Sequence, residues 1–245
     1  MAKMKARGAR VRQSRALGVQ EASGVARLPD GSFLVVDDEQ GVFRAWVDRP
    51  SERLAAGNGL ADLEGVCVTP DGSMAWLLSE RDGAVWRFGL DDGQPDRGTR
   101  LGRLPRESSK KNRGWEGLAF APAGTLADED LLVAAHQRGP RLVGLFEPES
   151  LAPRAMLSLP RAVKKRIRDL NDVTVHPTTG RIVIVSGKKG MLAELVLAGD
   201  QLEPSRLFRV EHAKDDVPEG VTYDAEGRLW LVTDGEGWLR ELDLD

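Results

Sequence analysis

Five residues with oxygen-bearing side chains open five copies of a repeated block, and their chemistry suits them to bind a metal ion. They are Ser23, Glu64, Glu116, Asn171 and Glu219. Where repeats are arranged around an axis, equivalent positions converge on one ring, and converging carboxylates repel one another unless a cation lies between them. Oxygen donors without cysteine or histidine favour Ca²⁺ or Mg²⁺, and a ring of several ligands suits Ca²⁺. The alternative is that each glutamate only caps a neighbouring element or faces water.

The repeat that carries these residues also predicts the fold. Its copies begin 41, 52, 55 and 48 positions apart. In every copy a second apolar strand follows, at 33–36, 75–78, 131–134, 182–185 and 229–232. A polar loop that ends in glycine and a third strand, such as 85–88, complete the visible pattern. Several short strands per unit at this period are typical of β-propeller blades, so the sequence predicts an all-β, five-bladed β-propeller.

A fourth, outer strand is expected in each blade. Candidates precede the following copies at 53–56, 100–104, 155–159 and 206–210. The last copy ends at Asp245 after its third strand, so we expect segment 15–19 to complete this blade and to close the ring, which removes free strand edges. Residues 1–12 are expected to form a disordered basic tail before a single domain over 13–245. A six-bladed ring is the alternative, and it would need a sixth copy.

The loops after the second strands are expected on the same face as the ring, because antiparallel neighbours run in opposite directions. They supply the expected ligand-binding residues Asp38, Glu80, Arg138, Lys188, Lys189 and Asp234. Basic connections at 106–113 and 161–168 also open there, so we expect an anionic small molecule or a partner protein at this mouth, where it could bridge to the metal. The alternative is that these basic residues are ordinary solvated charge.

Two functions remain open at this stage. One is a non-catalytic propeller that binds calcium and an anionic ligand or partner. The other is a metal-dependent hydrolase of a phosphoester or a lactone, in which the ion polarises the substrate and His136 transfers protons. His136 is the one histidine expected at this mouth, but a surface histidine without a chemical role is an equal alternative.

Composition excludes several other classes. The chain has 245 residues, a formal net charge of −3 and one cysteine. Cys67 therefore forms no intramolecular disulfide and is expected to be a small buried apolar residue. The net charge disfavours a dedicated nucleic-acid binder, and no apolar stretch is long enough to span a membrane. Without a secretory signal the cytoplasm is the expected location, or export if a leader has been removed.

The blade openings resemble those of the SdiA-regulated family of bacterial propeller proteins. The resemblance rests on segments 62–66, 114–119, 169–173 and 218–222 and extends from about Ala22 to the C-terminus. It implies a propeller that holds calcium and has no settled activity, and members of the family commonly look exported. The residue ring is also similar to the calcium ring of calcium-activated nucleotidases, the five-bladed soluble apyrases, which implies nucleotide hydrolysis as a possible activity. Segment 218–230 resembles six-bladed gluconolactonase-like enzymes.

Overall fold

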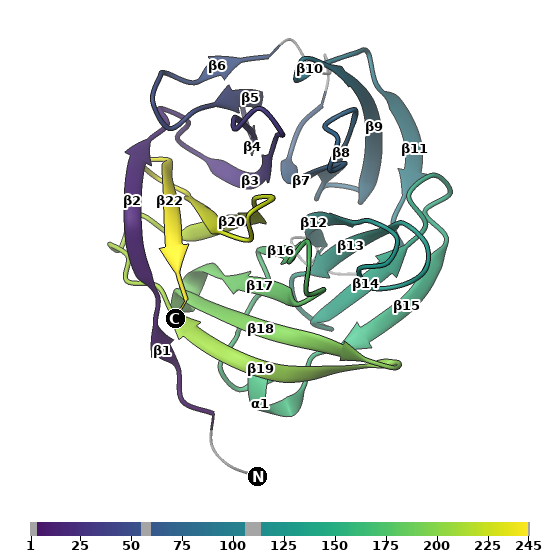
Figure 1. The fold of residues 1–245 in the computed structure, drawn as a ribbon, viewed down its shortest axis with the longest axis vertical. Helices are drawn as coiled ribbons and strands as arrows, with labels where there is room; N and C mark the ends of the chain where they lie inside the picture. The colour runs from purple at the N-terminus through teal and green to yellow at the C-terminus, as the bar shows by residue number, and fades with distance from the viewer. Residues whose placement is uncertain (1–3, 55–59, 106–113, 245) are drawn as a thin grey trace.

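A computed structural model describes residues 4–54, 60–105 and 114–244. In these residues five antiparallel sheets surround a central axis (Figure 1). Blade 1 has β3 (Ala22–Arg27), β4 (Phe33–Asp37), β5 (Gly41–Ala45) and β6 (Glu52–Arg53). Blade 2 has β7 (Leu63–Val68), β8 (Met74–Ser79), β9 (Ala84–Asp91), β10 (Gln94–Pro95) and β11 (Thr99–Arg103). Blade 3 has β12 (Trp115–Ala121), β13 (Leu131–His136), β14 (Leu142–Phe146) and β15 (Pro153–Ser158).

The last two blades complete the predicted five-bladed propeller. Blade 4 has β16 (Asp172–Val175), β17 (Ile182–Ser186), β18 (Met191–Ala198) and β19 (Gln201–Arg209), with β1 (Arg7–Gly8) parallel to its outer edge. Blade 5 has β20 (Pro218–Tyr223), β21 (Leu229–Thr233), β22 (Trp238–Asp243) and β2 (Arg10–Ala16). Two short helices, α1 (Arg161–Lys164) and η1 (Gly187–Lys189), lie in connections. No helix within the described ranges has the length and apolar character needed to cross a membrane.

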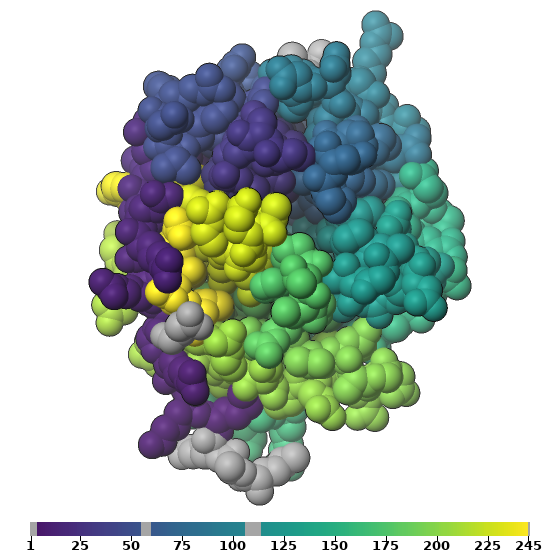
Figure 2. Space-filling model, in the orientation of Figure 1, coloured from purple at the N-terminus to yellow at the C-terminus, as the bar shows by residue number. Residues whose placement is uncertain are grey.

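The N-terminal strand closes the ring, as predicted, but it begins earlier in the chain than expected. β2 pairs antiparallel with β22 in a register that runs from Arg10 opposite Asp243 to Ala16 opposite Trp238. The N-terminal and C-terminal segments therefore lie against each other, as the purple and yellow atoms show (Figure 2). Residues 10–12 thus belong to a blade and not to the expected disordered tail, and residues 7–8 pair with β19.

The apolar residues that suggested a strand at 15–19 have another role. Leu17 and Val19 are buried in the core between blades 5 and 1, beside Trp230. β2 itself is almost entirely exposed, so its sequence carries little apolar signal. The closing strand therefore lies just before the buried segment that marked its position in the sequence.

Five apolar clusters fill the interfaces between neighbouring blades. Successive residues of a strand point to opposite faces of its sheet and so to different interfaces. In β4, Leu34 packs toward blade 2 and Val35 toward blade 5. Because both faces of each blade are covered, strands such as β14 are continuously apolar and buried. Cys67 packs between blades 2 and 3, as a small buried apolar residue.

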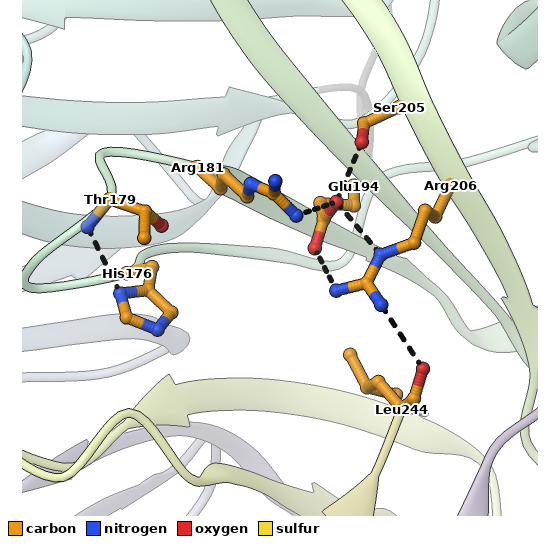
Figure 3. A network of polar contacts seen from close by, with 7 residues as sticks. All are labelled: His176, Thr179, Arg181, Glu194, Ser205, Arg206 and Leu244. Atoms are coloured by element: carbon orange, nitrogen blue, oxygen red, sulfur yellow. Dashed lines mark hydrogen bonds and ion pairs between the residues drawn. The ribbon is translucent and has the colours of Figure 1, made fainter.

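A buried ionic network links blade 4 to the end of blade 5 (Figure 3). Glu194 is 1% exposed and accepts hydrogen bonds from Arg181 at 3.0 Å, from Ser205 at 2.8 Å and from two nitrogens of Arg206 at 3.0 and 2.7 Å. Arg206 also donates to the Leu244 carbonyl at 3.3 Å. Burial alone would raise the pKa of Glu194, but the hydrogen bonds from Arg206 and Ser205 lower it. Glu194 is therefore held ionised within blade 4, and Arg206 extends the network to the end of blade 5.

Candidate functional site

The ring residues are aimed at the axis by β-bulges at the start of the inner strands. In four blades the pairing between the first two strands shifts by one residue, so that one residue of the inner strand is skipped. The skipped residues are Ser23, Glu64, Glu116 and Glu219. In blade 4, Asn171 donates its N–H to the Val185 carbonyl while Asp172 pairs with the same residue. A bulge re-aims a side chain, so five blades present one residue each to the mouth of the channel.

Contacts and charge interactions connect the five side chains at the mouth. Ser23 donates its hydroxyl to the Glu21 carbonyl at 3.2 Å and opposes the rise in the pKa of Glu64, and the Asn171 amide donates to Glu219. The charge of Glu64 acts on both Glu116 and Glu219. We call this set, Ser23, Glu64, Glu116, Asn171 and Glu219, the carboxylate ring.

Burial and the charges of neighbouring carboxylates raise the pKa of all three glutamates of the carboxylate ring. Burial, with the charges of Glu80 and Asp38, raises the pKa of Glu64 to about 8. Burial and the charge of Glu64 raise the pKa of Glu219 to about 8, although the Asn171 hydrogen bond opposes this shift. Glu116 is 5% exposed, and burial raises its pKa well above the ordinary value. In the absence of a cation Glu64 and Glu219 therefore retain protons near neutral pH.

Further carboxylates surround the ring. A hydrogen bond with Asp38, together with its charge, raises the pKa of Glu21 to about 7. Burial raises the pKa of Asp234, and the charge of Asp38 adds to this. One carboxylate oxygen of Asp38 and one of Glu80 are buried without a hydrogen-bond partner among the described residues. The charges of Asp38 and Glu80 act on Glu64, and the charge of Asp234 acts on Glu219, so these three predicted residues lie near the ring. Glu21 was not among the predicted residues, although it lies two positions before Ser23.

The floor of the mouth is a layer of glycines closed by one aspartate. A Cβ added to Gly24, Gly65 or Gly220 would lie 2.6 to 3.0 Å from the backbone of the next blade, and one added to Gly117 would lie 2.4 Å from the Cα of Asp172. Blade 4 has Asp172 at the equivalent position. Its buried carboxylate accepts backbone N–H groups of Leu118 at 3.2 Å, Val173 at 2.8 Å and Val221 at 2.7 Å. Asp172 thereby joins blades 3, 4 and 5 across the axis.

Sequence reasoning did not single out Asp172, although the sequence contains the signal. Glycine follows the ring residue in four copies, and Asp172 is the one exception. Burial raises the pKa of Asp172, while its three backbone donors oppose that shift. The backbones approach one another so closely here that only one side chain fits at this level of the channel.

The donor chemistry of the mouth fits a hard cation, but the side chains are not arranged around one. In the parts of the chain that the structure describes, no three aspartate, glutamate, histidine or cysteine side chains are placed to share a metal ion. The carbonyl oxygen of the Asn171 side chain, expected to face a metal, accepts the Gly187 N–H at 3.0 Å. The all-oxygen ring and the unpartnered oxygens of Asp38 and Glu80 suit Ca²⁺. Metal binding here would require rotation of side chains.

The predicted proton carrier does not face the mouth. His136 is 1% exposed, its Nδ1 lies 2.6 Å from the Pro140 carbonyl, and its ring packs edge-on against Trp115 with centroids 5.1 Å apart. This position inside blade 3 gives the proposed acid–base role no support. Alternate side chains of a strand point to the same face, so His136 is on the face of β13 that carries Leu132 and Ala134. Those two residues pack toward blade 2, so the sequence pattern could have predicted that His136 is buried between blades.

The basic residues expected at the mouth are only partly available there. Lys188 and Lys189 are exposed on η1. Arg138 instead donates to the Gln137 side chain at 2.7 Å. The basic connection at 106–113 lies outside the described residues. Carboxylates therefore predominate directly beside the ring, where Lys188 and Lys189 are the exposed basic residues of η1.

Comparisons with known proteins agree with this architecture. Among curated proteins, none matches this chain. The structure is similar to that of Myxococcus xanthus glutaminyl cyclase, with 17% identity, coverage of 99% of this chain and 98% of that one, and a TM-score of 0.70. It is also similar to the PQQ-bound aldose sugar dehydrogenase of Streptomyces coelicolor, with 15% identity, coverage of 97% and 98%, and a TM-score of 0.60. These two similarities show the propeller fold alone. A family model described as SdiA-regulated matches residues 52–236, and the chain therefore belongs to the SdiA-regulated family.

Proposed function

We propose that this protein is a non-catalytic, calcium-dependent binding propeller that receives an anionic ligand or partner at its acidic mouth. The crowding of Glu64, Glu116 and Glu219 carries the proposal. All three are largely removed from water, the charge of Glu64 raises the pKa of both other glutamates, and the charge of Glu219 raises that of Glu116. Without a cation, folding must either protonate these groups or accept their repulsion. A divalent ion would remove both costs.

Calcium suits the donors better than other metals. Ca²⁺ takes about six to eight oxygen ligands in a flexible geometry. The carboxylate ring supplies carboxylate, hydroxyl and amide oxygens, and Asp38 and Glu80 have unpartnered oxygens nearby. When bound, the ion would supply positive charge and a position to which an anionic oxygen can bind. The residues of the chain would then hold the ion and orient the ligand.

The rim explains why the ligand is expected to be anionic. Lys188 and Lys189 follow Gly187, whose backbone approaches the Glu219 carboxyl so closely that an added Cβ would lie 3.1 Å from Oε1. Their ammonium groups extend from the turn beside the ring, where they would add to the charge of the ion. An oxyanion could therefore be attracted by both. No chemical step is assigned, because the histidine expected to transfer protons is buried inside blade 3, and a propeller fold implies no activity by itself.

Calcium titration of chelator-treated protein tests the metal site. The melting temperature is expected to rise with Ca²⁺, because a ligand that binds only the folded state stabilises it. Glu219→Gln should weaken this response. Glu203→Gln, which makes the same change at an exposed position of β19, should leave it intact. Absence of a calcium response in the folded wild-type protein would contradict the proposal.

Anion binding is tested with inorganic phosphate as the probe. Calorimetric titration into calcium-loaded protein is expected to show binding that disappears with chelator and weakens in the double variant Lys188→Ala/Lys189→Ala. Binding unaffected by both changes would place the anion elsewhere. Calcium-dependent turnover of an aryl phosphate or a lactone would contradict the non-catalytic assignment.

A further inference from the structure

A second cavity lies at the end of the channel opposite the carboxylate ring. It has a volume of about 220 Å³ and is bordered by the second halves of all five inner strands and the turns that follow them. The turns contribute four prolines at equivalent positions and one alanine, namely Pro29, Pro70, Pro122, Pro177 and Ala225. Most of its other lining residues are apolar. We call this space the far cavity.

The far cavity does not continue into the acidic mouth. The glycine layer and the Asp172 carboxylate lie between them, and Asp172 bonds to Leu118 and Val221, which also line the far cavity. Backbone atoms of neighbouring blades approach too closely at this level to admit even one added Cβ. A ligand would therefore have to enter the far cavity from the opposite face, between the proline-containing turns.

One cationic group in this lining has an unused donor. Arg27 stacks on Phe33, with its guanidinium carbon 4.3 Å from the ring centroid, and lies 5.5 Å from the ring of Trp230. Its Nη1 is buried and has no hydrogen-bond partner among the described residues. A buried donor without a partner is costly, and it is more costly for a charged group. Burial lowers the pKa of Arg27, and the charge of Asp224 opposes the shift.

The nearby carboxylate does not satisfy this donor. Asp224 also lines the far cavity, but its Oδ2 accepts hydrogen bonds from Trp230 at 3.0 Å and from the Arg228 side chain at 2.7 Å. Its Oδ1 accepts the Arg228 backbone N–H at 2.8 Å. Asp224 is thus occupied by the turn to which it belongs. The Arg27 guanidinium makes no hydrogen bond among the described residues, so it remains the polar group of this lining best able to pair with a ligand.

We propose that the far cavity binds a small monocarboxylate with an apolar chain, its carboxylate on Arg27 and its chain among the inner strands. Guanidinium groups pair with carboxylates through charge-assisted hydrogen bonds. Small-ligand sites are commonly concave and apolar with a few polar groups that fix orientation. The volume corresponds to roughly seven water molecules, which suits a chain of roughly six carbon atoms. This site is separate from the calcium site and does not depend on it.

Ligand-observed NMR titration of the full chain with hexanoate tests the proposal. All titrations contain chelator, so that success or failure at the calcium site cannot affect the result. Saturable binding is expected for the wild type, with at least tenfold weaker binding by hexanamide, which lacks the charge, and by Arg27→Gln. Ala225→Trp should also weaken binding, because Ala225 is an exposed residue at the entrance.

Arg49→Gln is the matched control. Arg49 stacks on Trp46 at 3.8 Å, as Arg27 stacks on Phe33, but it does not line the far cavity. Its hexanoate affinity should equal that of the wild type, and melting curves should show that every variant is folded. The proposal is overturned if the folded wild-type protein shows no saturable binding of hexanoate. It is also overturned if the wild type binds hexanamide as tightly as hexanoate, or if Arg27→Gln binds hexanoate as tightly as the wild type does.

Discussion

Stability without metal is expected to fall as the pH rises through neutrality, because two buried carboxyls must lose their protons. The pKa values of Glu64 and Glu219 are raised from 4.5 to about 8 in the folded protein. A carboxyl whose pKa is higher in the folded than in the unfolded state contributes to the free energy of unfolding. This contribution is fully present below the pKa of the unfolded state and is lost as the pH rises through the pKa of the folded state. Between pH 6.5 and 7.5 each carboxyl is mostly protonated when folded and ionised when unfolded.

The structure sets the size of this effect. One proton difference corresponds to about 1.4 kcal/mol per pH unit, so two groups together give a slope of up to roughly 3 kcal/mol per pH unit. Burial also lowers the pKa of His176, which gives a slope of opposite sign at lower pH. The interval above the ordinary histidine pKa, about 6.5, is therefore preferred. A loss of this size is a large fraction of the stability of a typical domain.

Urea unfolding at pH 6.5, 7.0 and 7.5, with chelator and with saturating Ca²⁺, measures the slope. Calcium should flatten or reverse it, because the ion binds the ionised carboxylates and releases their protons. Glu219→Gln should reduce the metal-free slope by about 1.4 kcal/mol per pH unit, whereas Glu203→Gln should not change it. A metal-free stability that is constant or rises over this interval would refute the reasoning about the ring.

Three further predictions concern the fold. Deletion of residues 1–16 removes β2 and exposes the edge of β22, so the melting temperature should fall sharply; an unchanged value would contradict closure by this strand. Gly117→Ala should cost about 1–3 kcal/mol or more in urea unfolding, because its Cβ meets the next blade, whereas Gly8→Ala has open space and should be neutral. Glu194→Gln should lower the free energy of unfolding by about 1–3 kcal/mol, less than for a fully buried pair because Arg181 is 42% exposed; a change below about 0.5 kcal/mol would contradict its role in holding Arg181 and Arg206.

The blade count and the ring positions could be predicted because one physical requirement recurs in each repeat. The inner strands meet at the axis, where a glycine is needed for close backbone approach, and the preceding residue is aimed inward by a bulge. The pattern around Glu64 and Gly65 therefore reports tertiary structure directly. The closing strand lacks such a signal because its side chains are exposed. The apolar Leu17 and Val19, which are buried just after it, therefore place the predicted strand too late in the chain.

Side-chain directions within the site could not be predicted from spacing. The amide of Asn171 donates to Glu219 and its carbonyl accepts from Gly187, a choice that depends on both neighbours being in place. The unpartnered nitrogen of Arg27 likewise becomes visible only when the partners of Asp224 are known. Such features depend on contacts between blades that are distant in the chain, whereas strand positions depend on local pattern.

One inner strand per repeat contributes to both proposed sites, and the glycine layer decides whether they act independently. Residues before the glycine form the acidic mouth, and residues after it line the far cavity. Asp172 is the one side chain at this layer, and it belongs to the blade that carries Asn171. Its carboxylate accepts the N–H groups of Leu118 and Val221, which border the far cavity. Independent sites require that Glu219→Gln leave hexanoate affinity unchanged and that Arg27→Gln leave the calcium response unchanged. Coupling that disappears in Asp172→Asn would instead show that this carboxylate transmits between the two ends, because sites without shared contacts behave additively.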